Sequence, residues 1–304
     1  MSQLEARRRK PVAASPVLVL ALVGVSFAGP LIRLSRAHPL AIATWRLGLS
    51  LLVIAAFLLV RGEWRQWRRL SARELALAGG AGALLALHFW SWNASIGLTT
   101  VAASVVLVNT QPVIVAVLSA LWLREPPSRR QWAGIAVAMV GAALVAAPDL
   151  LVEGAPARRA ALGNLLALVG AVTAAIYFVS GRRLRGTLDL WPYVGLVYGA
   201  CFVVLLGLSF ASGVRLAGPP PRELAIFAAL ALGPMLLGHT GLNWALRYLP
   251  AYVVNLTLLG EPVGATIIAA LLPGIREVPP AATVGGGVLI LVGVLAASWR
   301  RERR

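Results

Sequence analysis

Four ionisable residues of this chain fall inside long apolar segments. Glu261 lies in NLTLLGEPVGATIIAALL, Arg46 lies in ATWRLGLSLL, and His88 and His239 lie in two further apolar runs. A charged group at the centre of a bilayer costs roughly 2.5–3.5 kcal/mol on insertion scales, so such residues mark functional sites. Glu261 could bind a cationic group, carry a proton, or bond backbone groups left unpaired by Pro262. Arg46 could pair with Glu261, with a carboxylate of a bound solute, or with backbone carbonyls.

Prolines and further polar residues accompany these four. Pro112 and Pro262 are expected to kink or open their helices, either to line a cavity with freed carbonyls or to bend for packing. Aromatic walls and polar side chains suit a small-molecule site. Tryptophan is, however, also typical of membrane interfaces. A polar residue within a span can equally form a hydrogen bond between two helices. The additional candidates for substrate binding are Trp92, Asn109, Gln111, Tyr177, Asn243, Trp244, Asn255 and Thr257.

The composition indicates which elements hold these residues. Hydrophobic residues make up 59% of the chain and charged residues 13%, whereas about a quarter of a soluble domain is charged. The apolar blocks are long enough to cross a hydrocarbon core of about 30 Å, and backbone in lipid must form helices there. We therefore predict an all-α polytopic membrane protein with ten transmembrane helices, at about 16–35, 39–60, 74–92, 99–122, 132–148, 162–180, 190–210, 224–243, 250–272 and 281–299.

The chain also matches itself at a nearly constant offset. Asn93 and Asn243 are 150 residues apart, and at the same offset TQPV falls on GEPV, so that Gln111 matches Glu261. At an offset of 152, residues of the first half match residues of the second: Glu125, Pro127, Gly134 and Gly141 fall on Glu277, Pro279, Gly286 and Gly293.

This self-match predicts two five-helix repeats, at 16–148 and 162–299, flanked by basic cytoplasmic tails at 1–15 and 300–304. Five is an odd number, so the second repeat must be inverted relative to the first. Inverted repeats are typical of secondary transporters, whose site lies near the midplane between the halves. The apolar run continues past Ala28 and the repeat needs the whole segment, so we expect the N-terminal stretch to be retained rather than cleaved as a signal peptide.

The basic charge is unevenly distributed along the chain. The net charge is +17, and with a cytoplasmic N-terminus 20 of the 28 basic residues fall inside and seven outside. This split follows the positive-inside rule and predicts that both termini are cytoplasmic, in the plasma (inner) membrane. The basic excess then faces anionic membrane lipid, and no nucleic-acid partner is expected.

The residues quoted above resemble the drug/metabolite transporter superfamily, in its EamA-type branch. The likeness rests on two five-span halves, a proline midway through the fourth and ninth spans, and a glutamate in the short loop after each (LREPP and IREVPP). Arg46 stands where that family often has a second-span arginine, whereas VSFAG departs from the family's Trp-Gly pair in the first span. The resemblance covers nearly the whole chain and implies a transporter of amino acids or other small metabolites.

We therefore predict a secondary transporter that exports amino acids or similar metabolites by alternating access. The alternative is a proton-coupled efflux pump for multiple drugs or lipophilic cations, in which Glu261 exchanges protons for cations. An enzyme is not expected, because the chain lacks H-E-x-x-H and G-x-S-x-G and its one lysine, Lys10, excludes a P-loop. The three histidines lack metal-ligand spacing, so neither a metal nor a cofactor is expected. No channel filter is recognisable, and a homodimer through the last spans stays open.

Overall fold

The computed structural model describes residues 11–150, 155–276 and 281–298. Every element of regular secondary structure in these ranges is a helix, which confirms the all-α prediction. In chain order they are α2 (Pro11–Ser26), α3 (Ala28–Leu34), α4 (Pro39–Arg61), the 3₁₀-helix η1 (Glu63–Arg69), α5 (Ala72–Ile96), α6 (Val101–Val108), α7 (Gln111–Leu118), the π-helix η2 (Ser119–Leu123), α8 (Arg129–Leu150), α9 (Ala155–Leu184), α10 (Leu190–Ala211), α11 (Pro221–Leu230), the π-helix η3 (Ala231–His239), α12 (Thr240–Ala245), α13 (Ala251–Leu258), α14 (Glu261–Leu271) and α15 (Ala281–Ser298).

Within the described residues, eight helical stretches are long and apolar enough to cross a membrane. They are Pro16–Leu34, Pro39–Arg61, Ala72–Ile96, Val101–Leu123, Arg158–Leu184, Leu190–Ala211, Pro221–Ala245 and Ala251–Leu271. The expected fifth and tenth spans correspond to α8 and α15, which are not among these eight; the apolar helix within α15 is the shorter Val284–Gly293. The count of ten is therefore not confirmed, although the polytopic membrane character is. Of the predicted tails, 1–10 and 300–304 lie outside the described residues, and 11–15 belong to α2.

The outer surface of the bundle is apolar, as a lipid-facing surface must be. Large hydrophobic side chains on several spans are strongly exposed, for example Leu52 at 69%, Leu59 at 72%, Leu121 at 75% and Phe210 at 71%. In water, an apolar surface of this extent would be an interaction or aggregation site. In a bilayer it is in contact with acyl chains at little cost.

Two spans are interrupted at matching positions of the two halves. α6 ends at Val108 with Asn109 as its C-cap, and α7 starts at Gln111 with Pro112 in its first turn. In the second half, α13 ends at Leu258 and α14 starts at Glu261 with Pro262 in its first turn. Proline has no N–H to donate and fits the first turn of a helix, so each helix restarts at the residue before its proline.

A further irregularity was not predicted. The span Pro221–Ala245 contains the nine-residue π-helix η3, with Pro234 inside it. Proline cannot donate to the helical ladder, and π-type turns are a common way to accommodate such a break. His239 is the last residue of η3, so this irregular segment sets its position. Pro234 was the sequence signal that could have indicated it.

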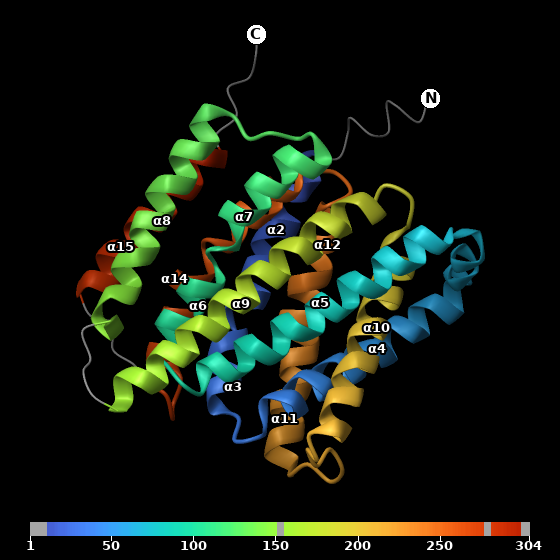
Figure 1. Cartoon of the computed structure of the whole chain (residues 1–304), viewed down its shortest axis with the longest axis horizontal. Helices are drawn as coiled ribbons and strands as arrows, with labels where there is room; N and C mark the ends of the chain where they lie inside the picture. The colour runs from blue at the N-terminus through green and yellow to red at the C-terminus, as the bar shows by residue number, and fades with distance from the viewer. Residues whose placement is uncertain (1–10, 151–154, 277–280, 299–304) are drawn as a thin grey trace.

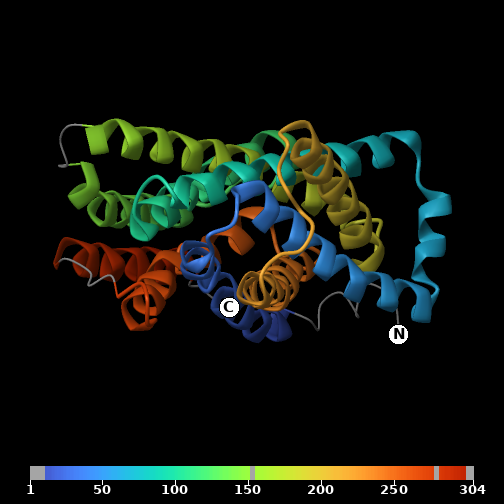
Figure 2. The ribbon, with the colours of Figure 1, turned by 90° about the horizontal axis from the view of Figure 1, so that it is seen from below.

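The last helix of each half packs against the other, at one end of the long axis of the molecule (left in Figure 1; Figure 2). A β-carbon built on Gly141 of α8 would lie 2.5 Å from the carbonyl oxygen of Gly286 of α15. One built on Gly293 of α15 would lie 2.5 Å from the carbonyl oxygen of Gly134 of α8. The earlier glycine of α8 therefore lies beside the later glycine of α15, and the later one beside the earlier. The two helices run antiparallel, with their backbones in close contact.

Candidate functional site

A small closed cavity lies between the two halves of the chain. About 20 Å³ of it is open to the centre of a water molecule, which is room for roughly one water. Helices of both halves contribute to its wall, which consists of Val25, Ala28, His88, Trp92, Val108, Gln111, Phe178, His239, Leu258 and Glu261. Five of the residues proposed from the sequence therefore meet here: His88, Trp92, Gln111, His239 and Glu261.

The interrupted helices bring two of these residues to the cavity. Gln111 is the first residue of α7 and Glu261 the first residue of α14. The unpaired N–H groups at a helix N-terminus favour negative charge, so the start of α14 is a favourable place for the carboxylate of Glu261. Gln111 occupies the matching place in the first half with a neutral amide.

Glu261 is held by a residue of the opposite half. Its side chain is 5% exposed, and its Oε2 accepts a hydrogen bond from Asn109 Nδ2 at 3.2 Å. Asn109 also donates to the Val105 carbonyl oxygen at 2.9 Å, which fixes its side chain at the end of α6. No cationic residue in the described part of the chain forms an ion pair with Glu261, so the pairing with Arg46 considered from the sequence is not made in this structure.

Arg46 is fully buried in α4 and lies behind the cavity wall. Its guanidinium carbon is 4.3 Å from the centre of the Phe89 ring, and its Nη2 is 3.8 Å from Met235 Sδ. Its Nε and Nη1 have no hydrogen-bond partner among the described residues. The Phe89 ring also meets His239, with the ring centres 5.3 Å apart. One aromatic ring therefore contacts both the arginine and a residue of the cavity wall.

The two histidines face each other across the cavity, with ring centres 6.2 Å apart. His88 Nδ1 lies 2.9 Å from the Gly170 carbonyl oxygen, which can only accept, so this nitrogen carries the proton. In the neutral ring, Nε2 is then an acceptor. His88 also stacks on Trp92, which is 3% exposed and therefore lies inside the protein rather than at a membrane interface.

Several polar atoms around the cavity have no hydrogen-bond partner among the described residues. They are Trp92 Nε1, Asn109 Oδ1, Gln111 Oε1 and His239 Nδ1. Buried polar groups are nearly always paired, so unpaired ones need an explanation. Here they supply both donors and acceptors within an aromatic wall, which is the character of a site for a small amphipathic solute.

Two predicted site residues belong to a separate buried cluster. Asn243 Nδ2 donates to the hydroxyl of Tyr177 at 2.5 Å and to that of Tyr198 at 3.1 Å. Tyr198 also lies 3.3 Å from the Thr240 hydroxyl. Tyr198 and Thr240 were missed from the sequence, although the tyrosines in WPYVGLVYGA were a signal for buried polar groups in that span. Neither Tyr177 nor Asn243 lines the cavity.

The three remaining candidates also lie away from the cavity wall. The ring of Trp244 packs on Tyr248, with centres 4.7 Å apart. Asn255 donates to the Ala251 carbonyl oxygen of its own helix at 3.2 Å, and Thr257 is half-buried in α13. These side chains therefore take part in packing within the second half.

Hydrogen bonds and ion pairs connect the helices at both ends of the bundle. At the predicted outer end, Arg33 donates to the Ile96 carbonyl oxygen at 2.7 Å, and Arg36 N donates to Glu223 at 3.1 Å. At the predicted cytoplasmic end, Arg182 donates to the Leu246 carbonyl oxygen at 2.7 Å. Ile96 and Leu246 are 150 residues apart, so the two arginine–carbonyl bonds occupy matching places in the two halves. Each of these arginine–carbonyl bonds lies within one half; the halves themselves are joined by Arg36 N and Glu223 at the predicted outer end and by Arg182 and Glu125 at the predicted cytoplasmic end.

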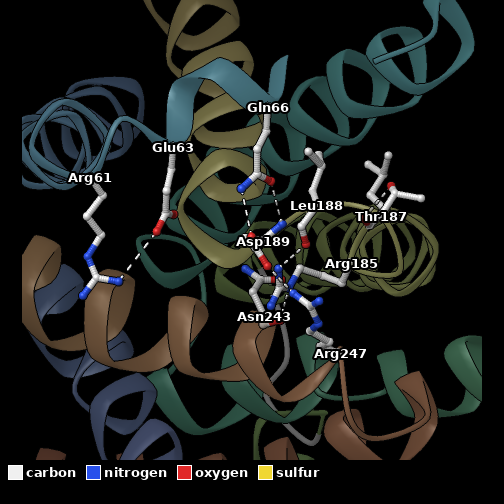
Figure 3. Close-up of polar contacts among 10 residues, drawn as sticks. Arg61, Glu63, Gln66, Arg185, Thr187, Leu188, Asp189, Asn243 and Arg247 are labelled. Atoms are coloured by element: carbon white, nitrogen blue, oxygen red, sulfur yellow. Dashed lines mark hydrogen bonds and ion pairs between the residues drawn. The ribbon is translucent and has the colours of Figure 1, made fainter. Parts of the chain in front are cut away.

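Two further contacts strengthen the predicted cytoplasmic end. Arg182 Nη2 lies 2.7 Å from Glu125 Oε1, which joins α9 to the segment between η2 and α8. Nearby, Arg247 pairs with Asp189, and Gln66 Nε2 donates to the same carboxylate at 2.8 Å (Figure 3). Burial alone would raise the pKa of Asp189, but hydrogen bonds from Arg247 and Gln66 outweigh it and hold that pKa below its ordinary value.

Known proteins similar to this chain are transporters. At 27% identity, the chain matches the uncharacterized transporter YyaM of Bacillus subtilis over 86% of its own length and 84% of the relative. At 29% identity, it matches a probable terminal-alkyne amino-acid exporter of Streptantibioticus cattleyicolor over 77% of the chain and 76% of the relative. A protein of known crystal structure has the same fold, with a TM-score of 0.75 at 18% identity over 94% of this chain and 96% of that one.

The family model of the EamA-like transporters matches the chain twice, at residues 14–147 and 161–299. The two matches cover nearly all of the sequence and correspond to the two halves that meet at the cavity. They confirm the resemblance inferred from the sequence and exclude an enzyme as the basic activity. This integral membrane protein therefore belongs to the EamA-like transporter family.

Proposed function

We propose that this chain is a secondary transporter that exports a small zwitterionic solute, most simply an amino acid, across the inner membrane. The observation that carries the proposal is the closed cavity between the halves, with Glu261 in its wall and Arg46 directly behind Phe89. An acid in the cavity wall and a buried arginine on Phe89, whose ring contacts His239 of the wall, match the two charged ends of an amino acid. The relative from Streptantibioticus cattleyicolor, a probable amino-acid exporter, supports the same class of solute.

In this proposal each charged group binds one end of the solute. Glu261 binds the ammonium group at the start of α14. Arg46 binds the carboxylate through Nε and Nη1, the two atoms that lack partners, once Phe89 moves from the guanidinium. The side chain of the solute then contacts His88, Trp92 and Phe178. The cavity must expand to admit the solute, because in this structure it holds about one water.

Transport then proceeds by alternating access between two inverted five-helix repeats, 16–148 and 162–299, with α8 and α15 as the fifth and tenth helices. The antiparallel packing of α8 on α15 supports inversion, because equivalent helices of inverted repeats run in opposite directions. In this proposal the bond of Arg36 N to Glu223 and the ion pair of Arg182 with Glu125, which join the two halves, supply one closure for each side. Both termini, including the basic segments 1–15 and 300–304, lie in the cytoplasm in this arrangement.

A second candidate is a proton-coupled efflux pump for lipophilic cations. It is favoured by one observation: Glu261 is a buried acid without a cationic partner in the described part of the chain. Such a carboxyl can exchange a proton for a cationic substrate. In this reading Arg46 has no role in binding the substrate.

Counterflow in proteoliposomes tests both candidates. Vesicles are loaded with one unlabelled solute from a panel of aromatic and aliphatic amino acids, a nucleoside and a lipophilic cation, and uptake of the labelled solute is measured. We expect exchange of amino acids, reduced roughly tenfold or more by Glu261→Gln and by Arg46→Gln, since each removes a charged hydrogen bond worth about 1.5–3 kcal/mol. Glu63→Gln, at a surface ion pair with Arg61, is the matched control. If only the lipophilic cation is exchanged, and Arg46→Gln does not affect this exchange, the result would favour the efflux pump over the amino-acid exporter.

A further inference from the structure

A second, larger pocket lies at the predicted cytoplasmic end of the bundle. It has a volume of about 410 Å³ and is lined by Leu123, Glu125, Arg182, Arg185, Gly186, Arg247 and Tyr248. The wall comes from the ends of α9 and α12 and from the segment after η2, so residues of both halves meet here. This pocket is separate from the central cavity, with which it shares no lining residue.

The wall of this pocket is predominantly basic. It contains three arginines and one acid, Glu125, which is already bonded to Arg182 at 2.7 Å. Arg247 pairs with Asp189, whose side chain is 51% exposed and lies outside the wall (Figure 3). Among the described residues Arg185 makes no ion pair, and the carboxylate of Asp189 acts on its charge only at longer range.

Arg185 is the unusual member of the group, because it is only 1% exposed. Its Nε donates to the Asn243 carbonyl oxygen at 3.1 Å and its Nη1 to the Leu188 carbonyl oxygen at 2.5 Å (Figure 3). Its Nη2 makes no hydrogen bond to any described residue. Burial, together with the neighbouring charge of Arg247, lowers the pKa of Arg185 to about 10, so it remains a cation at neutral pH. A buried cation is costly unless an anion compensates it.

The position of the pocket indicates the source of that anion. Arg185 directly follows Leu184, the last residue of its membrane span, and therefore lies at the depth of the lipid head groups. The positive-inside distribution assigns this end to the cytoplasmic leaflet, where anionic lipids are found. The planar fork of an arginine matches the oxygens of a phosphate. Leu123 and Tyr248 add an apolar side to the wall, which suits a head group that continues into a glycerol and acyl chains.

We propose that this pocket binds the phosphate group of an anionic phospholipid, with Arg185 Nη2 as its central donor and Arg182 and Arg247 at its sides. The bound phosphate neutralises the buried arginine and joins the ends of α9 and α12 to the loop that carries Glu125. The proposal does not depend on which solute is transported, but it does depend on the predicted orientation in the membrane.

The test is thermal unfolding of the full chain in nanodiscs of phosphatidylcholine, with and without phosphatidylglycerol. We expect phosphatidylglycerol to raise the Tm of the wild type, and we expect Arg185→Gln to lose this increment. Each variant is compared with its own Tm in pure phosphatidylcholine, so a general loss of stability does not affect the result. Arg247→Gln, at a more exposed position, should reduce the increment without perturbing the buried bonds of Arg185. Arg69→Gln removes the same charge from an exposed site of the same face and should retain the increment.

Two further experiments decide whether the bound phosphate belongs to a lipid or to a soluble ligand. Native mass spectrometry of the purified protein should detect retained phosphatidylglycerol on the wild type and on Arg69→Gln, but less on Arg185→Gln. Inorganic phosphate and glycerol 3-phosphate, added to pure phosphatidylcholine discs, should produce no comparable rise in Tm. A rise with these soluble phosphates that Arg185→Gln abolishes would overturn the lipid source in favour of a soluble phosphate ligand. The same increment in wild type and Arg185→Gln would overturn the site itself.

Discussion

Asn109 and Glu261 join the two interrupted spans of this transporter across the interface between its halves. Asn109 caps the end of α6 and donates from Nδ2 to Glu261 Oε2, at the start of α14, at 3.2 Å. Both residues stand where a helix is interrupted ahead of a proline, Asn109 as the C-cap of α6 and Glu261 as the first residue of α14. In the proposed function a solute that binds Glu261 competes with this bond, so the bond would couple occupancy of the site to the relative position of the halves.

Removal of the Asn109 amide should impair exchange. Asn109→Ala deletes a hydrogen bond to a charged group, worth about 1.5–3 kcal/mol, from the closed arrangement. If that arrangement is an obligatory intermediate, counterflow should fall about tenfold or more while the protein still folds. Asn255→Ala is the matched control, because Asn255 is equally buried but donates only to a carbonyl of its own helix. Equal rates for the two variants would show that the bond to Glu261 has no part in transport.

The tie between Arg182 and Glu125 should hold the predicted cytoplasmic end closed. Glu125→Gln removes an ion pair of 2.7 Å that is partly buried, with side-chain exposures of 22% and 28%. Exposed pairs contribute up to about 1 kcal/mol, so opening toward the cytoplasm should increase by up to about fivefold. The measurement is labelling of Gln111→Cys in a Cys201→Ala background by a membrane-impermeant thiol reagent from the cytoplasmic side.

Glu63→Gln serves as the control for this labelling, because its pair with Arg61 joins no helix of the cavity wall. Labelling should accelerate in Glu125→Gln and not in Glu63→Gln. Labelling of both variants at the wild-type rate would show that the pair of Arg182 with Glu125 does not hold this end closed.

The sequence was sufficient to predict those site residues whose place is determined by the local sequence and by its match in the other repeat. Gln111 and Glu261 could be found because a polar residue followed by proline in an apolar run predicts a helix break in any packing arrangement. The positions of Gln111 and Glu261 are set by local backbone chemistry, which a single sequence contains. His88 and His239 could be found as polar residues in apolar runs, but the π-helix η3 that positions His239 was not predicted.

Residues whose role depends on which helix faces meet could not be predicted in the same way. Whether Arg46 reaches Glu261 or lies against Phe89 is decided by the rotation of α4 relative to α5. Asn243 forms hydrogen bonds with Tyr177 and Tyr198 because α9, α10 and α12 come together in the tertiary structure, which one sequence does not reveal. Arg185 reads as an ordinary basic residue after a span, and only its burial distinguishes it.

Close contact of α8 with α15 should depend on the absence of side chains at Gly141 and Gly293. Gly141→Ala places a β-carbon 2.5 Å from the Gly286 carbonyl oxygen, so the two backbones must separate. Overpacking of this kind costs about 1–3 kcal/mol, which should lower the Tm measured in detergent. Gly199→Ala is the control, because a β-carbon there meets nothing within 4 Å. A mid-helix glycine replaced by alanine without a clash should stabilise by about 0.5–1 kcal/mol, so the two variants should shift the Tm in opposite directions.

The pair formed by Asp189 and Arg247 should give the stability a dependence on acid pH. Hydrogen bonds from Arg247 and Gln66 hold the pKa of Asp189 below its ordinary value of about 3.9, so folding favours its ionised form. A depressed carboxyl pKa contributes stability above the ordinary value, and this contribution is lost as the pH falls through the folded pKa. The wild type should therefore lose Tm from about pH 5 downward more steeply than Asp189→Asn, in which this contribution is absent at every pH.

The size of this effect is limited by solvent, because the two side chains are 41% and 51% exposed. Solvent screening reduces an exposed pair to at most about 1 kcal/mol, so the difference between the two Tm curves should be small and should shrink at high salt. Glu63→Gln, which removes another carboxylate paired with an arginine, is the control variant. Parallel curves for wild type and Asp189→Asn from pH 6 to pH 3 would show that the contacts with Arg247 and Gln66 do not stabilise the ionised carboxylate.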